Sequence, residues 1–100
     1  MTFEFLGPAS KEFEEAFDWY AKRSLKAAEG FRQAIALAIA DGMQNPTSAG
    51  VMMGKRSRKI PLTPYRYGLV YFVHRDFFYI VAIAPNRRPP GYWKRRIRAA

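Results

Sequence analysis

The sequence contains no cysteine and one histidine, His74. The lack of cysteine excludes a disulfide scaffold, cysteine-based zinc sites and cysteine nucleophiles, and it fits a reducing cytosol. A single histidine leaves no imidazole pair for a metal site, and its place at a predicted turn favours a surface residue over a catalytic base. We therefore expect no metal and no organic cofactor.

Long hydrophobic runs are also missing. No apolar stretch reaches the length that a bilayer-spanning helix needs. Residues 1–5 lack the basic start of a signal peptide. We expect a cytoplasmic protein that makes no membrane contact.

Acidic residues are nearly absent from the second half of the chain. Residues 46–100 contain twelve Lys or Arg and one acid, Asp76, whereas residues 1–45 contain five Lys or Arg and seven acids. Such an excess of positive charge weakens the fold through self-repulsion and attracts polyanions. The formal net charge of +9 predicts a partner that is nucleic acid, a nucleic-acid-bound machine or an acidic protein.

The chain has 100 residues, 49% of them hydrophobic, which predicts one globular domain over residues 1–100. Residues 2–6 alternate like a short strand that Gly7 and Pro8 stop. A first amphipathic helix is predicted over residues 9–23 with Ser10 as its cap, and its acids Glu12, Glu15 and Asp18 follow solvent-face spacing. A second helix follows a break near Leu25 and ends before Pro46, and a single bent helix is the alternative.

Residues 44–54 are rich in turn formers and are predicted to be a loop. The apolar period then changes to two. Residues 56–62 indicate an edge strand or an extended arm, because Pro61 cannot donate to a ladder. Residues 67–73 and 77–84 indicate two strands joined in a hairpin by residues 74–76. The predicted order is β-α-α-β-β-β with a basic tail, an α+β domain whose helical hairpin packs on a small sheet.

Two basic clusters are the candidate sites. In the tail, six cations surround Tyr92 and Trp93; arginines bind phosphate in a fixed fork, and aromatic rings stack on bases. A packing role is the favoured interpretation for Trp93 itself. Four cations at residues 55–59 form the other cluster, where alternation puts Arg56 and Arg58 on one face. The candidate binding residues are Arg56, Arg58, Lys59, Arg87, Arg88, Trp93, Arg95 and Arg96.

The two clusters form one concave basic surface if they are neighbours in the fold. The alternatives are a charged edge at residues 55–59 that prevents sheet-to-sheet aggregation, and a solvated basic chain end.

The chain resembles the RelE/ParE superfamily of toxins from bacterial type II toxin–antitoxin pairs. The resemblance covers FEEAFDWY at residues 13–20, QNP at 44–46, YGLVYFV at 67–73 and YIVAIA at 79–84. It is most specific at NRRPPGYWKRR, residues 86–96, which is similar to the family tail H-x-R-R-x-P-x-Y-W-x-x-R.

The resemblance implies a mainly antiparallel sheet, plasmid stabilisation or growth inhibition as the function, and an acidic antitoxin that forms a hetero-oligomer with the toxin. RelE-type members of the superfamily cut mRNA on the ribosome without a metal, whereas ParE-type members inhibit DNA gyrase. The resemblance implies that the catalytic residues of the RelE-type nucleases correspond in this chain to Lys59, Arg87 or Arg88, and Tyr92.

Three positions depart from the nuclease pattern. Gly68 stands where nucleases have an arginine, Pro61 where a second lysine is expected, and Pro85 where the tail histidine is expected. Arg66 replaces the missing arginine only if the strand is bulged. Each lost donor to a reacting phosphate weakens transition-state stabilisation.

We therefore predict a ParE-like toxin that inhibits gyrase. The alternative is a RelE-like, metal-independent endoribonuclease with Lys59, Arg87, Arg88 and Tyr92 as catalytic residues. A third reading is a non-toxic module that binds nucleic acid.

Overall fold

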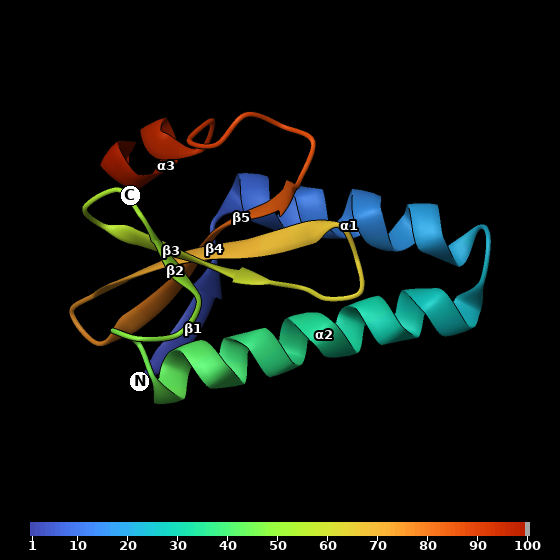
Figure 1. Cartoon of the computed structure of the whole chain (residues 1–100), viewed down its shortest axis with the longest axis horizontal. Helices are drawn as coiled ribbons and strands as arrows, with labels where there is room; N and C mark the ends of the chain where they lie inside the picture. The colour runs from blue at the N-terminus through green and yellow to red at the C-terminus, as the bar shows by residue number, and fades with distance from the viewer. Residues whose placement is uncertain (100) are drawn as a thin grey trace.

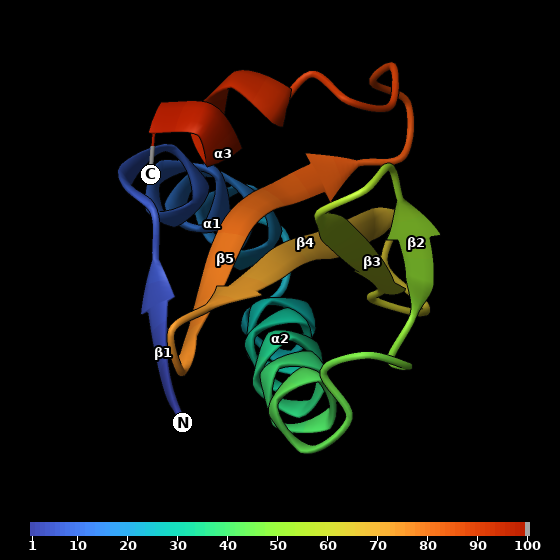
Figure 2. The same ribbon diagram turned by 90° about the vertical axis from the view of Figure 1, so that its left-hand side faces the viewer.

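A five-stranded sheet carries a helical hairpin on one face and a short C-terminal helix on the other (Figures 1 and 2). The structure is a computed structural model and describes residues 1–99. Its elements are β1 (Thr2–Phe5), α1 (Gly7–Ala21), α2 (Leu25–Gln44), β2 (Val51–Met53), β3 (Ser57–Pro61), β4 (Tyr67–His74), β5 (Phe77–Pro85) and α3 (Lys94–Ala99).

The sheet order is β1-β5-β4-β3-β2. Strand β1 runs parallel to β5, and every other neighbouring pair is antiparallel. The predicted α+β class, the helical hairpin and the mainly antiparallel sheet are confirmed. The strand β2 and the helix α3 were not predicted. None of the helices within residues 1–99 is long and apolar enough to cross a membrane.

Helix α1 begins two residues earlier than predicted. Its first turn contains Pro8, and its N-cap residue Leu6 offers no side-chain hydrogen bond. Ser10 lies inside the helix and donates its N–H to the Leu6 carbonyl at 3.0 Å, so its prediction as a cap is wrong. Proline suits a first helical turn because its φ is fixed near the helical value and its missing N–H would have no partner there. The cap of α2 is Ser24, which accepts a hydrogen bond from the Ala27 N–H at 3.1 Å.

The predicted hairpin of β4 and β5 is confirmed. Its two turn residues, Arg75 and Asp76, have φ of 49° and 66°. Such a turn matches the right-handed twist of the paired strands. Both faces of these strands are buried, and two separate groups of side chains cover them.

The helix face of the sheet packs against α1 and α2. Leu69, Tyr71, Phe78 and Ile80 meet Phe31 and other apolar side chains of the helical hairpin there. We call the opposite side the tail face. Its buried residues are Val70, Phe72, Val81, Ala82, Ala84, Trp93 and Ile97.

Strand β2 lies within the predicted loop and makes β3 an inner strand. The prediction of residues 56–62 as a sheet edge is therefore wrong. Gly50 leads into β2 with φ of 63°, and a Cβ at this position would collide with the carbonyl oxygen of Lys59. Only glycine combines this backbone conformation with so close an approach. The turn between β2 and β3 is closed by Ser57, whose hydroxyl donates to the Met53 carbonyl at 2.7 Å.

Candidate functional site

The tail face brings cations from both predicted clusters to one side of the sheet. The Arg56 guanidinium lies 5.3 Å from the ring centre of Phe72, in cation–π geometry. The side chain of Lys59 extends over Gly68 and contacts the space that a Cβ would occupy there. Phe72 belongs to the same buried group as Trp93 of the tail. Arg56 and Lys59 thus share their face of the sheet with the C-terminal segment.

Arg58 points the other way. Its Nε donates to the Ala49 carbonyl at 2.7 Å, and its Nη2 donates to the Gly50 carbonyl at 3.2 Å. The prediction that Arg56 and Arg58 share a face is wrong, because Arg56 belongs to the turn and strand alternation begins only at Ser57. Arg58 therefore holds the loop before β2 and lies outside the basic face.

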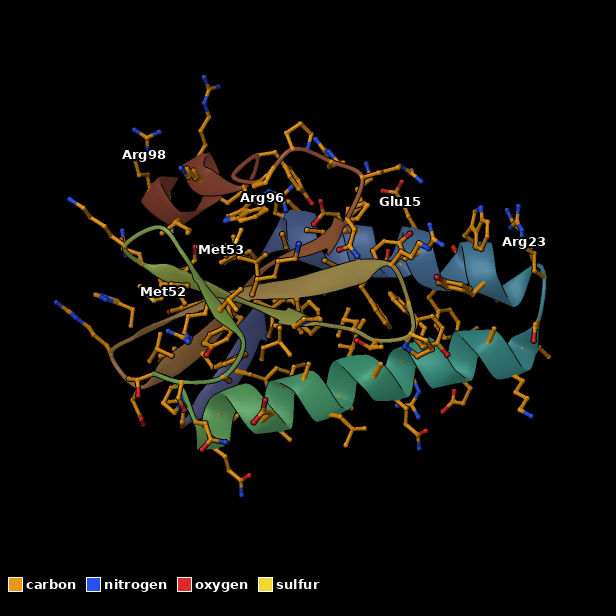
Figure 3. All side chains as sticks on the ribbon, in the orientation of Figure 1. Glu15, Arg23, Met52, Met53, Arg96 and Arg98 are labelled. Carbon is orange, nitrogen blue, oxygen red and sulfur yellow. The ribbon has the colours of Figure 1, made fainter. Side chains whose placement is uncertain are left out.

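The tail contributes five exposed cations. Arg87 and Arg88 follow β5 in a turn, and the Arg88 guanidinium lies 3.7 Å from the ring centre of Tyr92. Lys94, Arg95 and Arg98 are exposed on α3, and Figure 3 shows Arg98 directed outward. We call the exposed cations Arg56, Arg87, Arg88, Lys94, Arg95 and Arg98, together with the half-buried Lys59, the basic face.

Glu12 of α1 binds the tail to the helical hairpin. Its carboxylate accepts hydrogen bonds from the Tyr92 hydroxyl at 2.8 Å, the Ile83 N–H at 3.1 Å, and two Arg96 nitrogens at 2.8 and 3.1 Å. The Glu12 side chain is only 17% exposed. Its prediction as a solvent-facing acid is wrong, because the tail returns over this face of α1. Arg96 also donates to the Val81 carbonyl at 3.0 Å and is committed to this network.

The same network sets the acid–base behaviour of the tail. Burial, and then the hydrogen bond to Glu12, raise the pKa of the Tyr92 hydroxyl far above its ordinary value. The hydrogen bonds that Arg96 donates to the Glu12 carboxylate raise the pKa of Arg96, which stays a cation. A tyrosine of ordinary pKa is already neutral at physiological pH, and the raised pKa makes loss of the Tyr92 proton harder still, so Tyr92 is poorly suited to act as a general base.

Trp93 is a core residue. Its side chain is 2% exposed and packs with Ile97 against the tail face, which confirms the packing role favoured from the sequence. Its indole Nε1 has no hydrogen-bond partner among the described residues. Stacking on a base would require the tail to leave the sheet, so Trp93 does not belong to the basic face.

Gly68 marks the main departure from a nuclease site. A Cβ at this position would collide with the Lys59 side chain, whose Cγ would lie at 2.9 Å. An arginine at position 68 would therefore clash with the side chain of Lys59 in its present position. Lys59 therefore has no second cation beside it on β4. Within residues 1–99, no group of three His, Cys, Asp or Glu could hold a metal ion.

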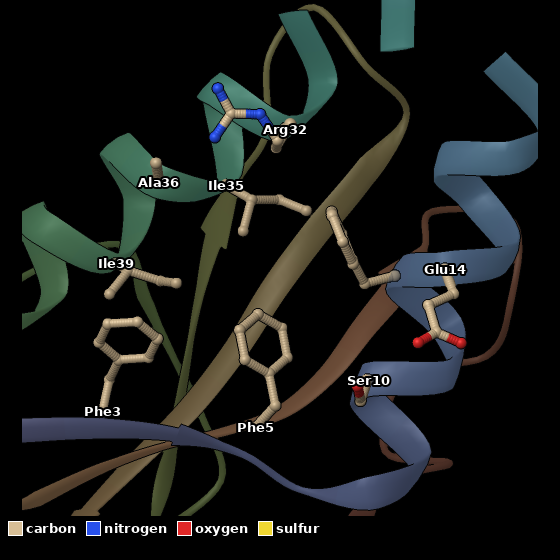
Figure 4. Close-up of a pocket in the computed structure, with 9 residues that line it drawn as sticks. Phe3, Phe5, Ser10, Glu14, Arg32, Ile35, Ala36 and Ile39 are labelled. Carbon is tan, nitrogen blue, oxygen red and sulfur yellow. The ribbon is translucent and has the colours of Figure 1, made fainter. Parts of the chain in front are cut away.

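A second surface feature was missed from the sequence. A groove of about 450 Å³ opens between the edge strand β1 and the two long helices (Figure 4). Phe3 and Phe5 point from β1 toward Ile35 and Ile39 of α2. The remaining lining residues are Ser10, Phe13, Glu14, Arg32 and Ala36. The alternation of Phe3 and Phe5 was visible in the sequence, but the position of β1 at a sheet edge was not.

Of three comparisons with known proteins, the one with solved structures found a match. No protein-family model matches the sequence. No curated protein matches it either. The structure is similar to a solved chain described as "Chromosomal ParDE TA system from P. aeruginosa", with a TM-score of 0.72 and 17% sequence identity over 85% of this chain and 95% of that chain. This likeness agrees with the ParE-like fold predicted from the sequence.

Proposed function

We propose that this chain is the toxin of a type II toxin–antitoxin pair and that it inhibits growth by binding DNA gyrase. Its fold is that of a chain from a ParDE toxin–antitoxin system, and its tail resembles the closing motif of the RelE/ParE superfamily. An acidic antitoxin neutralises it in the cytoplasm. The formal net charge of +9 supports such a partner, because opposite charge speeds and steers association.

The state of Tyr92 is the observation that favours inhibition by binding over RNA cleavage. A ribonuclease needs groups that accept a proton from the ribose hydroxyl and stabilise charge on the phosphate. In this chain the Tyr92 hydroxyl donates to Glu12, Arg96 is paired with the same carboxylate, and Gly68 provides no cation. The contacts of Tyr92 and Arg96 with Glu12 hold the main chain of the tail in place, and the exposed cations of the tail project from it.

The basic face is the proposed contact with the target. Arg56 and Lys59 come from the β2–β3 region, while Arg87, Arg88 and Arg95 come from the tail. The tail is held in place by the hydrogen bond of Tyr92 to Glu12 and by the packing of Trp93 in the buried group of the tail face. Binding through cations on an ordered main chain costs less backbone entropy than binding through cations on a flexible chain end, so the fixed tail favours affinity.

The rival function is a RelE-like, metal-independent endoribonuclease acting on ribosome-bound mRNA. Its specific support is the presence of Lys59, Arg88 and Tyr92 on the tail-face side of the molecule. In that case Lys59 and Arg88 bind the phosphate and Tyr92 lies beside the scissile bond.

Purified components separate the two functions. The chain is tested for inhibition of gyrase supercoiling and, separately, for cleavage of mRNA on ribosomes. We expect supercoiling to be blocked while mRNA stays whole, and we expect Lys59→Glu or Arg88→Glu to relieve the block. Lys26→Glu, an exposed cation at the start of α2, is the matched control and should inhibit like the parent.

Two outcomes would reject the proposal. Cleavage of ribosome-bound mRNA that Lys59→Ala or Tyr92→Phe abolishes would establish the nuclease instead. Unchanged growth on expression of the chain without its partner would favour the non-toxic binding module.

A further inference from the structure

Three aromatic side chains form a row across β4 and β5 on the tail face. Phe72 and Tyr79 are paired across the two strands, and their rings stack with centres 5.1 Å apart. Phe77, two positions earlier on β5, lies on the same side, and its ring stacks on Tyr79 with centres 5.7 Å apart. We call these three side chains the aromatic row. Phe77 is paired with His74 at the end of β4, whereas Gly68 and the nuclease-like positions lie near its start.

The aromatic row is closed at one end and open at the other. The Arg56 guanidinium lies 5.3 Å from the ring centre of Phe72, and it comes from the β3 side of the sheet, away from β5. Phe72 itself is 4% exposed. Phe77, at the other end, is 40% exposed. Single exposed apolar residues are common on protein surfaces, but Phe77 is the last member of an ordered stack. Its outer face therefore offers a place where a further planar ring can stack.

Positive charge surrounds the open end of the row. Arg75 is exposed in the β4–β5 turn, next to Phe77. Figure 1 shows this turn, the β2–β3 turn and α3 at one end of the long axis, and Figure 2 faces that end. Lys55 is exposed in the β2–β3 turn, and Arg98 projects outward from α3 (Figure 3). A polyanion that reaches Phe77 would meet these cations.

Two acids lie near the row. Glu4 of β1 is paired with Tyr79 and shares its side of the sheet. Asp76 follows Arg75 in the turn and faces the Met1 amino group at 3.8 Å. The cations of this end, which are Lys55, Arg56, Arg75 and Arg98, outnumber these two acids.

We infer that the aromatic row and the cations around it bind a single strand of DNA. One base stacks on the outer face of Phe77, and the neighbouring phosphates lie near Arg75 and the β2–β3 turn. Stacking on an aromatic side chain tolerates any base sequence, because every base has a flat π face. A duplex gains nothing from Phe77, since its bases already stack on one another. The inference rests on the proposed function in one respect, the choice of DNA over RNA, because gyrase acts on DNA.

The first experiment measures binding of a labelled oligodeoxyuridine by fluorescence anisotropy. We expect Phe77→Ala to weaken binding by about tenfold, because the stacked base loses its platform. Phe77→Leu keeps an apolar side chain without a π face and should lose about as much, whereas Phe77→Tyr should bind like the parent. The matched control is Phe3→Ala. Phe3 is 48% exposed on the helix-face side of β1 and should not affect binding.

A duplex that contains the same strand separates stacking from charge. Phe77→Ala should leave duplex binding unchanged, and an equal loss for both ligands would overturn the stacking assignment. Arg75→Gln should weaken single-strand binding and reduce its salt slope by about 0.7, as expected for one lost phosphate contact. Lys26→Gln, at the opposite end of the long axis, is its control. Glu4→Gln should tighten binding, because it removes an acid beside Tyr79.

The second experiment uses the unsubstituted chain, so it stays informative if a Phe77 variant fails to fold. An oligonucleotide that contains bromodeoxyuridine is bound, irradiated and mapped by mass spectrometry, because this base forms cross-links to aromatic side chains on which it stacks. We expect the cross-link at Phe77 or Tyr79. Cross-links confined to other residues would overturn the inference. Tighter binding of oligouridine than of oligodeoxyuridine would also overturn it, because RNA would then be the preferred strand.

The supercoiling assay separates this inference from the proposed function. If the chain blocks gyrase but does not bind the single strand, the inference alone fails. If the strand binds and cross-links to Phe77 while supercoiling proceeds, the proposed function fails and the single-strand site remains.

Discussion

The hydroxyl of Tyr92 donates a hydrogen bond of 2.8 Å to the carboxylate of Glu12, 80 positions earlier in the chain. The same carboxylate accepts from Arg96 and from the main chain of β5. Three segments that are distant in sequence thus meet at one acid. This contact turns a proline-rich basic tail into a fixed part of the fold.

Removing Glu12 should destabilise the protein strongly. In Glu12→Ala, Arg96 and Tyr92 keep their places near the core but lose their shared acceptor, and a half-buried cation is left unpaired. We expect the free energy of unfolding to fall by about 2–3 kcal/mol, measured by urea denaturation. Glu15→Ala, on the exposed side of the same helix, should change it by less than about 0.5 kcal/mol. Equal effects of the two substitutions would show that the network adds nothing to stability.

The pKa of Tyr92 predicts how stability changes at high pH. Its folded-state pKa is raised, so above about pH 10 the unfolded chain loses this proton while the folded chain keeps it. Stability from this group is complete below about pH 10 and is lost as the pH rises further toward the folded-state value. We expect Tyr92→Phe to show a shallower loss of stability than the parent when urea unfolding is repeated at increasing alkaline pH. Parallel curves would contradict the coupling.

Lys59 and Gly68 should be energetically coupled. Gly68→Ala places a methyl group against the Lys59 side chain, and we expect a loss of about 1 kcal/mol in the parent. With Lys59→Ala the space is empty, so Gly68→Ala should cost almost nothing. Urea denaturation of the parent, both single variants and the double variant gives the coupling, which we expect to be about 1 kcal/mol. Additive effects would mean that the lysine moves aside without cost.

Local patterns were sufficient to predict the long elements. The apolar runs around residues 74–76 predicted the β4–β5 hairpin because strands covered on both faces have no polar side. The spacing of Phe31, Ile35 and Ile39 predicted the buried stripe of α2 for the same kind of reason. Charge raised the hypothesis of one concave basic surface on the condition that residues 55–59 and the tail are neighbours. The Lys59 side chain and the tail lie on the same face of the sheet, and the concave surface stays a prediction.

The errors arose where short elements or distant contacts decide the structure. Three residues are too few for β2 to show a period, and Gly50 and Gly54 on either side of it are typical of loops. Helix α3 has six residues and follows Pro89, Pro90 and Gly91, which indicate an irregular tail. The partners of Glu12 lie more than 70 positions away, so helical spacing alone gave it the wrong surroundings.

The pairing of β1 with β5 has a consequence for synthesis of the chain. The first strand to leave the ribosome, Thr2–Phe5, finds its register only against residues 77–80. Until those residues emerge, Phe3 and Phe5 lack the backbone partner that fixes them beside α2. The hydrogen bonds to the Glu12 carboxylate form later still, because their donors Tyr92 and Arg96 are near the end of the chain. A growing chain therefore completes neither the pairing of β1 nor the Glu12 network until most of its residues have been translated.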